Sequence, residues 1–451
     1  MTSALVYIGV MLIIICVWFA VLKRPIYEAV LISFLFLVFI TNSWSNIWTY
    51  IDKGLNTSLI YSMIAFVAMS QLLSSAKVID SCVGIILSLL GRITGGAGYV
   101  SVVASSFMGA LSGSGPGNIM STGVITIPAM KKSGFPAELA ANVESNASYL
   151  GNMIPPSSNI VAALGAYLAL YPNSEITTGQ FWIVLWGIAI WFILQRLLMV
   201  FAFCKYYKVK PMSKEELPGL RETLRLGWKG LLLPIFIIVP FVLDFLLKDS
   251  LFASRLGETG AKYFSSSLLI FIPGLASMYI LFFAGKKKSN IKEIVSTFEK
   301  GVKSLVPAVA TCIFGYMIGA LFADLDVAAS LEQFIVNIEL GKFGMVLVIP
   351  LITCFLGMII PGSSLVVMFG TVFIAAFETV GVSPLLAAAM LPCICGTMCG
   401  ITPPLALGMY AGMSIAESDF SKTVRNDLWW VAAQYVLEVL VLMGWLPIMG
   451  L

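Results

Sequence analysis

Long apolar runs separated by short polar intervals form the main pattern of this chain. The clearest runs cover residues 4–22, 26–40, 181–204, 231–247, 265–284 and 428–446. A helix of about 20 apolar residues crosses a hydrocarbon core of about 30 Å. Counting the weaker runs as well, the pattern predicts an all-α polytopic membrane protein with about ten to twelve transmembrane helices.

Four clusters of glycine, proline and hydroxyl residues interrupt this pattern. They are the first break (residues 112–117, SGSGPG), the second (151–156, GNMIPP), the third (357–364, GMIIPGSS) and the fourth (396–404, GTMCGITPP). The first two breaks are spaced much like the last two, which indicates an internal repeat. Interrupted segments at matching places in two halves point to substrate and ion sites at the repeat interface. The alternative is that these glycines only allow close helix packing.

The positions of the charged residues predict on which side of the membrane the polar intervals lie. The chain is 59% hydrophobic and 11% charged, with a formal net charge of +4, so nucleic acid is not a natural partner. Lys and Arg gather in two intervals, residues 205–229 and 286–303, with two apolar spans between them. The positive-inside rule places both intervals in the cytoplasm and predicts that the N-terminus and the C-terminus lie outside.

Few ionisable groups lie near the breaks, and this bears on the coupling ion. Between residues 104 and 174 they are Lys131, Lys132, Glu138 and Glu144, and between 351 and 415 only Glu378 is present. The chain has no His. A proton-coupled carrier generally needs an intramembrane acid or His, whereas Na⁺ can be held by unwound backbone carbonyls and hydroxyls. The sequence therefore favours Na⁺. Half-helix N-termini and the amides of Asn118, Asn146, Asn152 and Asn159 suit an anionic organic substrate.

Three motifs resemble the large membrane subunit of the tripartite ATP-independent periplasmic (TRAP) transporters of bacteria and archaea. They are GALSGSGP (109–116), IPAMKKSGF (127–135) and LGNMIPPS (150–157). The resemblance implies a sodium-driven importer of the cytoplasmic (inner) membrane, with two re-entrant helical hairpins in two pseudo-symmetric inverted repeats. It also implies an elevator movement of a transport domain against a scaffold. The expected partners are a small four-helix membrane subunit and a soluble substrate-binding protein.

The resemblance also implies a division of the chain into domains. Residues 1–90 are expected to be N-terminal scaffold helices, 91–180 the first half of the transport domain, 181–345 scaffold and connecting helices with cytoplasmic loops, 346–416 the second half of the transport domain, and 417–451 a C-terminal helix.

The resemblance also implies which residues bind sodium and substrate, by their positions in the matching motifs. The first sodium site would use Ser112 with the backbone of Gly151, Ile154 and Pro156, and the second would use Gly357, Cys399 and Thr402. The substrate would lie near Ser114, Asn118, Asn152, Ser364 and Thr397. For each glycine and proline the alternative is a hinge without a ligand. Gly117-Asn118 departs from the family, which often has Ala followed by a small hydroxyl or acidic residue there, and this bears on ligand geometry and substrate class.

Other functions fit the sequence less well. A stand-alone symporter or exchanger of the wider ion-coupled superfamily, for example as a homodimer, would need neither partner protein. An enzyme would need a nucleophile with a base in reach, and a channel would need a ring-forming filter sequence. Cys393, Cys395 and Cys399 are irregularly spaced for a metal-thiolate site. The leading hypothesis is Na⁺-driven uptake of a small organic acid, without an organic cofactor.

Overall fold

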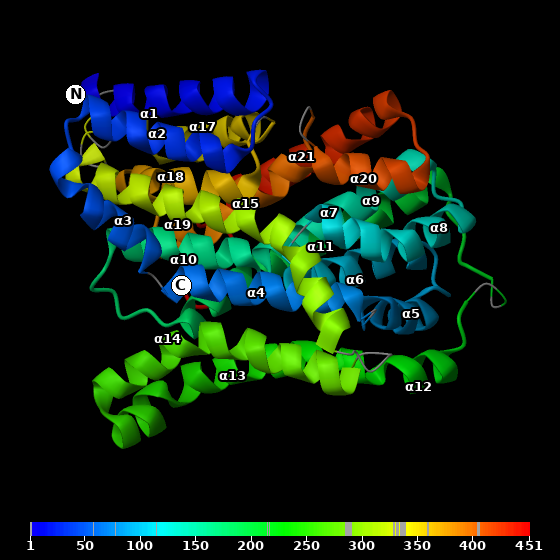
Figure 1. Cartoon of the computed structure of the whole chain (residues 1–451). Coiled ribbons are helices and arrows are strands. Elements are labelled where there is room, and N and C mark those ends of the chain that lie inside the picture. Colours follow the sequence, from blue (N-terminus) through cyan, green and yellow to red (C-terminus); the bar gives the residue numbers. More distant parts are fainter. Residues whose placement is uncertain are drawn as a thin grey trace.

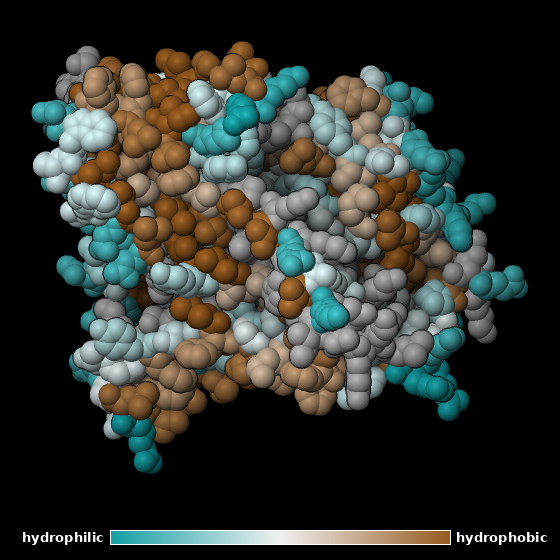
Figure 2. All heavy atoms as spheres, viewed as in Figure 1, coloured by the Kyte–Doolittle hydropathy of each residue, from teal (hydrophilic) through white to brown (hydrophobic). Residues whose placement is uncertain are grey.

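The computed structural model describes residues 2–56, 58–76, 78–113, 115–213, 215, 217–284, 291–327, 330, 333, 340–358, 360–403 and 406–451. The elements of this part of the chain are helices, most of which run in one common direction (Figure 1). Apolar side chains such as Phe39, Leu198 and Phe282 are well exposed. Figure 2 shows apolar surface between hydrophilic groups that gather mainly at the left and right edges of the molecule. This distribution suits a protein whose middle faces lipid, and the predicted all-α membrane fold is confirmed.

The N-terminal elements follow the predicted apolar runs. They are α1 (Thr2–Ile15), η1 (Cys16–Val21), α2 (Ile26–Ile40), η2 (Trp44–Asn46), α3 (Ile47–Leu55), α4 (Ser58–Ser75) and α5 (Val78–Leu90). The run predicted at residues 26–40 coincides with α2, and the run at 4–22 is divided between α1 and η1. Both chain termini lie toward the left end of Figure 1.

The first two breaks belong to a hairpin followed by an interrupted helix. The elements are α6 (Gly96–Ser112), α7 (Gly115–Asn118), η3 (Ile119–Gly123), α8 (Val124–Lys132), α9 (Ala137–Leu150), η4 (Gly151–Met153) and α10 (Ser158–Leu170). Helix α6 ends at Gly113, whose φ of 63° is left-handed, and the chain returns through α7 and α8 against α6. Every residue of α9 from Leu139 to Leu150 is buried, so this helix forms the centre of the molecule.

The third and fourth breaks repeat this arrangement. The elements are α17 (Lys342–Gly357), α18 (Gly362–Thr379), α19 (Pro384–Leu391), η7 (Pro392–Thr397), η8 (Met398–Gly400) and α20 (Leu407–Ala416). Helices α17 and α18 form the second hairpin, and the helix from α19 to α20 is interrupted at η7 and η8. The turn before each interrupted helix contains a glycine with positive φ, Gly134 at 93° and Gly381 at 78°. The predicted correspondence between the halves is therefore visible in the order of the elements.

The remaining elements connect and flank the two halves. They are α11 (Thr178–Tyr207), α12 (Leu220–Leu231), α13 (Leu233–Leu247), η5 (Lys248–Phe252), α14 (Ala253–Tyr279), η6 (Ile280–Ala284), α15 (Ile291–Asp324) and α21 (Phe420–Leu442). Helix α21 corrects one boundary, because the last apolar run was predicted to begin at residue 428. Instead α21 begins at Phe420, and Thr423, Asn426 and Asp427 are buried in it. Helix α9 binds these residues, with Asn142 Nδ2 donating to Thr423 O at 2.9 Å.

By length and composition, four described helices are suited to cross a membrane. They are Ala137–Leu170, Thr178–Tyr207, Gly227–Asp244 and Gly362–Thr379. The bent pair Trp44–Leu55 and Ile60–Leu73 makes a fifth if it is one span. The other apolar helices are 10–17 residues long, because breaks and turns interrupt them: Val6–Ile15, Ile26–Ile40, Ser81–Leu90, Gly96–Leu111, Ile270–Ala284, Val309–Asp324, Lys342–Gly357, Pro384–Gly400 and Leu407–Ala416.

Candidate functional site

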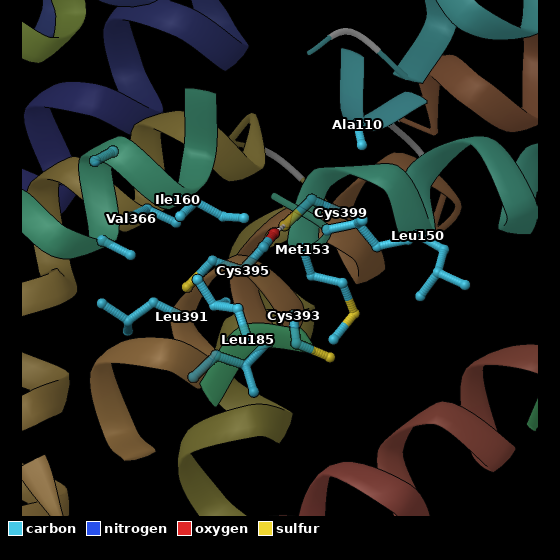
Figure 3. Packing of buried hydrophobic residues seen from close by; sticks show 14 of the residues in the cluster. Ala110, Leu150, Met153, Ile160, Leu185, Val366, Leu391, Cys393, Cys395 and Cys399 are labelled. Atoms are coloured by element: carbon cyan, nitrogen blue, oxygen red, sulfur yellow. Dashed lines mark hydrogen bonds between the residues drawn. The ribbon is translucent and has the colours of Figure 1, made fainter. Parts of the chain in front are cut away.

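The two interrupted helices meet at the centre of the protein. The η4 segment packs against η7, and Asn152 Nδ2 donates to the backbone oxygen of Gly396 at 3.3 Å. Figure 3 shows Leu150 and Met153 of the second break beside Cys393, Cys395 and Cys399 around the fourth. The irregular segment of one interrupted helix is therefore joined to the irregular segment of the other by a hydrogen bond from a side chain to the backbone.

Each hairpin packs on the interrupted helix of its own half through glycine. A Cβ added to Gly151 would lie 2.4 Å from the carbonyl carbon of Gly109 on α6. In the second half, a Cβ on Gly362 would lie 2.4 Å from the oxygen of Cys395. Any side chain larger than hydrogen would push these backbones apart, so glycine is needed for the close approach.

The predicted sodium residues fall into two groups. Ser112 ends α6, and its neighbour Gly113 faces Ser158 at the start of α10. Gly151 still has helical backbone at the start of η4, whereas Ile154 has extended backbone (φ −98°, ψ 126°), so within the second break the chain leaves the helix at Ile154.

The second group consists of Gly357, Cys399 and Thr402. A Cβ on Gly357 would lie 2.1 Å from Cys399 Sγ, so these two residues touch. The thiol of Cys399 donates to the oxygen of Cys395, and Thr402 Oγ1 donates to Met398 O at 2.9 Å. Both side chains are thus engaged with their own turn of helix.

The predicted substrate residues are mostly occupied by the protein itself. Asn118 Nδ2 donates to Ser105 O and Ser148 Oγ, both at 2.8 Å, and Thr397 Oγ1 donates to Cys393 O at 2.6 Å.

Ser364 is buried in the first turn of α18, and Ser114 lies outside the described residues. The amides of Asn118 and Asn152 are bound to protein oxygens, which leaves Oδ1 of each buried without a partner in the described structure. The atom of Asn152 that is still able to bind a ligand is therefore Oδ1, which is a hydrogen-bond acceptor.

Sequence reasoning missed the role of Glu144. Its carboxylate is fully buried in α9 and accepts hydrogen bonds from five hydroxyl groups. Oε2 accepts from Ser101 and Thr126, each at 2.6 Å, and Oε1 accepts from Ser105, Thr122 and Ser148 at 2.8, 2.5 and 3.1 Å. These five residues come from α6, η3, α8 and α9, so one anion joins the first hairpin to the interrupted helix. An ionised carboxylate fits this cage because every neighbour is able to donate.

A second polar cluster beside the fourth break was also missed. Gln434 on α21 accepts from Arg196 Nη2 on α11, and its Nε2 donates to Thr397 Oγ1. The same Nε2 donates to Glu438 Oε1 at 2.9 Å. About two helical turns earlier on α21, Asp427 Oδ1 accepts from Asn146 Nδ2 at 3.0 Å. An ionisable residue inside an apolar run, such as Arg196 or Glu438, was the available signal.

The comparisons decide the family. A family model described as "Tripartite ATP-independent periplasmic transporter, DctM component" matches residues 7–449. This chain belongs to the DctM family of TRAP transporter large permeases. The resemblance predicted from the motifs is confirmed, and the chain is a transport protein rather than an enzyme. As a DctM permease it is a multi-pass protein of the inner membrane.

Relatives of this DctM permease are distant but span most of the chain. It is 23% identical over 411 residues to the C4-dicarboxylate TRAP transporter large permease protein DctM of Vibrio cholerae, covering 86% of each chain. It is 22% identical to the sialic acid TRAP transporter large permease protein SiaM of the same organism, covering 86% of this chain and 83% of SiaM.

Solved structures share the fold of this permease. MtrF of Neisseria gonorrhoeae, from a class of antimetabolite efflux pumps, aligns with a TM-score of 0.64 at 12% identity over 91% of this chain and 87% of MtrF. The YdaH transporter of Alcanivorax borkumensis aligns at 0.59 and 15% identity, over 90% and 88%. These likenesses concern the fold alone.

Proposed function

We propose that this permease carries out Na⁺-coupled uptake of a small organic anion by an elevator movement. The observation that carries the proposal is the contact between the second and fourth breaks through Asn152 and Gly396. Unwound helices that meet between two repeats are the arrangement in which secondary transporters hold substrate and coupling ions. The names of the relatives, which refer to C4-dicarboxylates and sialic acid, support an acid as the substrate.

The carbonyl and amide oxygens at the second break support the proposal that a cation binds there. Hard cations bind backbone and amide carbonyls, and Asn152 Oδ1 is a buried acceptor in the second break, where the backbone becomes extended at Ile154. The residues present therefore fit a sodium ion held by the backbone of Gly151, Ile154 and Pro156 near Asn152. We assign the second sodium ion to the close contact of Gly357 with Cys399, together with Thr402. Ser112 completes the first site, and Ser364 and Thr397 face the substrate.

A cavity of about 570 Å³ supports both the anion and the movement. Its lining combines α10 and α18, expected in the transport domain, with α3, η5 and α15, expected in the scaffold. Lys53 and Lys248 belong to this lining together with Glu175, so its charged side chains carry one net positive charge, which would attract an anion. Gly165, Gly315 and Gly319 also line it, so small residues lie where the two parts would slide.

As in a tripartite transporter, the partners would be a small four-helix membrane subunit and a soluble substrate-binding protein. The binding protein would deliver the substrate from the side on which both termini lie. In the elevator cycle, the substrate would enter the cavity from that side.

The test is uptake by proteoliposomes that contain the purified chain, with and without a small subunit and a binding protein. The substrates are a panel of C4-dicarboxylates and sugar acids, under an inward Na⁺ gradient or an inward proton gradient. We expect uptake only with Na⁺ and with both partners. Uptake driven by protons without Na⁺ would refute the coupling, and Na⁺-driven uptake by the chain alone would favour the stand-alone carrier.

Substitutions at Asn152 sharpen this assay. Asn152→Leu removes the acceptor and should raise the Na⁺ concentration for half-maximal uptake about tenfold, as expected for a contact of about 1.4 kcal/mol. Asn152→Asp keeps an oxygen, so it should preserve the Na⁺ requirement and weaken binding of an anionic substrate. Asn56→Leu on the exposed surface is the control and should change neither. An unchanged Na⁺ requirement in Asn152→Leu would contradict the assignment.

A further inference from the structure

Three ionisable side chains are buried together where α11 and α21 flank the fourth break. Arg196 is 1% exposed, Asp427 is 2% exposed and Glu438 is fully buried. Arg196 lies within electrostatic range of both acids, but its terminal nitrogens bind Gln195 and Gln434. Within the described structure it forms no ion pair with either carboxyl group, and its Nε has no partner. Two acids against one base leave one net negative charge if all three are ionised.

Glu438 is the member of this cluster with too few partners. Oε1 accepts from Gln434 Nε2 at 2.9 Å and from Cys393 Sγ at 3.3 Å, whereas Oε2 is buried without a described partner. An unpaired charged oxygen in a dry interior costs far more than an unpaired neutral hydroxyl. A proton on Oε2 therefore removes the larger penalty and leaves Arg196 and Asp427 as a balanced pair of charges.

The surroundings of Glu438 suit a proton better than a metal ion. Gln434 and Cys393, which touch its carboxyl group, offer N–H and S–H donors, whereas a sodium ion needs several oxygens. The titratable groups that face Glu438 are Arg196 on α11, Cys354 on α17, Cys393 and Cys395 on η7, Cys399 on η8, and Tyr435 on α21 itself. Arg196 is the only cation in that set.

We propose that Glu438 is a proton-binding site linked to the fourth break through Gln434. The amide of Gln434 donates to Glu438 and Thr397 from the same nitrogen, and its oxygen is held by Arg196. When Glu438 loses its proton, the new charge competes for that amide and for the free Nε of Arg196, and Thr397 loses its donor. Deprotonation breaks the O–H bond at Oε2, and the carboxylate keeps the two electrons of that bond. The proton site itself is independent of sodium coupling, while its link to a substrate residue rests on the proposed function.

The experiment uses the full chain in lipid bilayers, with the proton as the probe. Infrared difference spectra between about pH 5 and about pH 9 record the C=O stretch of protonated carboxyl groups. Glu438→Gln keeps the size of the side chain and removes the titrating group, and Glu144→Gln is the matched control at the other fully buried glutamate. We expect a protonated-acid band that is lost at alkaline pH, is missing in Glu438→Gln and remains in Glu144→Gln.

Labelling with ¹³C-glutamate shifts the band of a Glu but not that of an Asp, and in the Glu144→Gln background the test holds even if Glu438→Gln does not fold. A band that is absent, that is insensitive to pH, or that persists in Glu438→Gln would overturn the proposal. Loss of the band in Glu144→Gln alone would also overturn it, because the proton would then lie in the first half.

Repeating the titration with NaCl in place of choline chloride separates this proposal from the proposed function. A sodium ion near Thr402 would stabilise the ionised carboxyl group, so the band should disappear at lower pH with Na⁺. An unchanged midpoint would contradict the nearby sodium site, while loss of the band in Glu438→Gln would still support the proton site.

Discussion

Glu144 and Glu438 are both fully buried glutamates, the first on the interrupted helix of its half and the second on α21 beside the other interrupted helix, but their environments differ. Glu144 accepts from five hydroxyl groups that come from four elements. Glu438 has one amide, one thiol and a distant guanidinium, and one of its oxygens is unpartnered. A fully partnered carboxylate fixes the elements around it, whereas an underpartnered one is able to change its protonation state. Burial alone therefore does not reveal the role of an acid in the membrane.

Removal of the Glu144 carboxylate should produce the largest effect on stability. Glu144→Ala leaves five buried hydroxyls around a cavity and detaches the first hairpin from α9. We expect a cost of about 3–5 kcal/mol, as for other broken buried charge networks. Thermal unfolding of the purified chain measures it, with the exposed Glu175→Ala as control. A variant as stable as wild type would show that the cage does not hold the hairpin.

A pair of glycine substitutions tests whether the two interrupted helices are packed equally tightly. Gly151→Ala places a Cβ 2.4 Å from the backbone of Gly109, and we expect a loss of about 1–3 kcal/mol from overpacking. Gly396→Ala meets the side-chain nitrogen of Asn159 at 3.2 Å, and because a side chain is able to move we expect less than about 1 kcal/mol. The melting temperatures of the two variants give the comparison. Equal losses would contradict it.

Single donors of the Glu144 cage should have the smallest effect. Ser101→Ala removes one of five hydroxyls, and the other four continue to solvate the carboxylate, so we expect a loss of about 1 kcal/mol. Ser121→Ala is the control, because Ser121 is only partly buried and its hydroxyl donates to the backbone oxygen of Gly117, not to Glu144. A loss as large as that of Glu144→Ala would mean that the cage acts as a single unit.

Local sequence was enough to locate the breaks and the hairpins. Glycine and proline act on the backbone of their own neighbourhood, so SGSGPG and GNMIPP predict the interruption of a helix without knowledge of the tertiary structure. The same locality explains why α2 coincides with its apolar run, whereas α21 begins earlier than predicted. The polar residues at its start are buried only because α9 lies against them.

The motifs also determined the family, which the match over residues 7–449 confirms. The predicted site residues, the sodium ions and the domain boundaries stay predictions. Sequence spacing places Asn118 and Asn152 near the breaks, but it does not reveal which atoms of their amides the protein itself uses.

By itself, the sequence determined an all-α membrane transporter with two matching halves, because apolar periodicity and backbone-breaking residues are local properties. Only the tertiary structure decided which polar groups share the interior. Arg196 and Gln434 are 238 positions apart and yet hydrogen-bonded, and the donors of Glu144 come from separate elements. In a dry interior the partners of a charge decide whether it stays ionised, and those partners are set by how the helices pack.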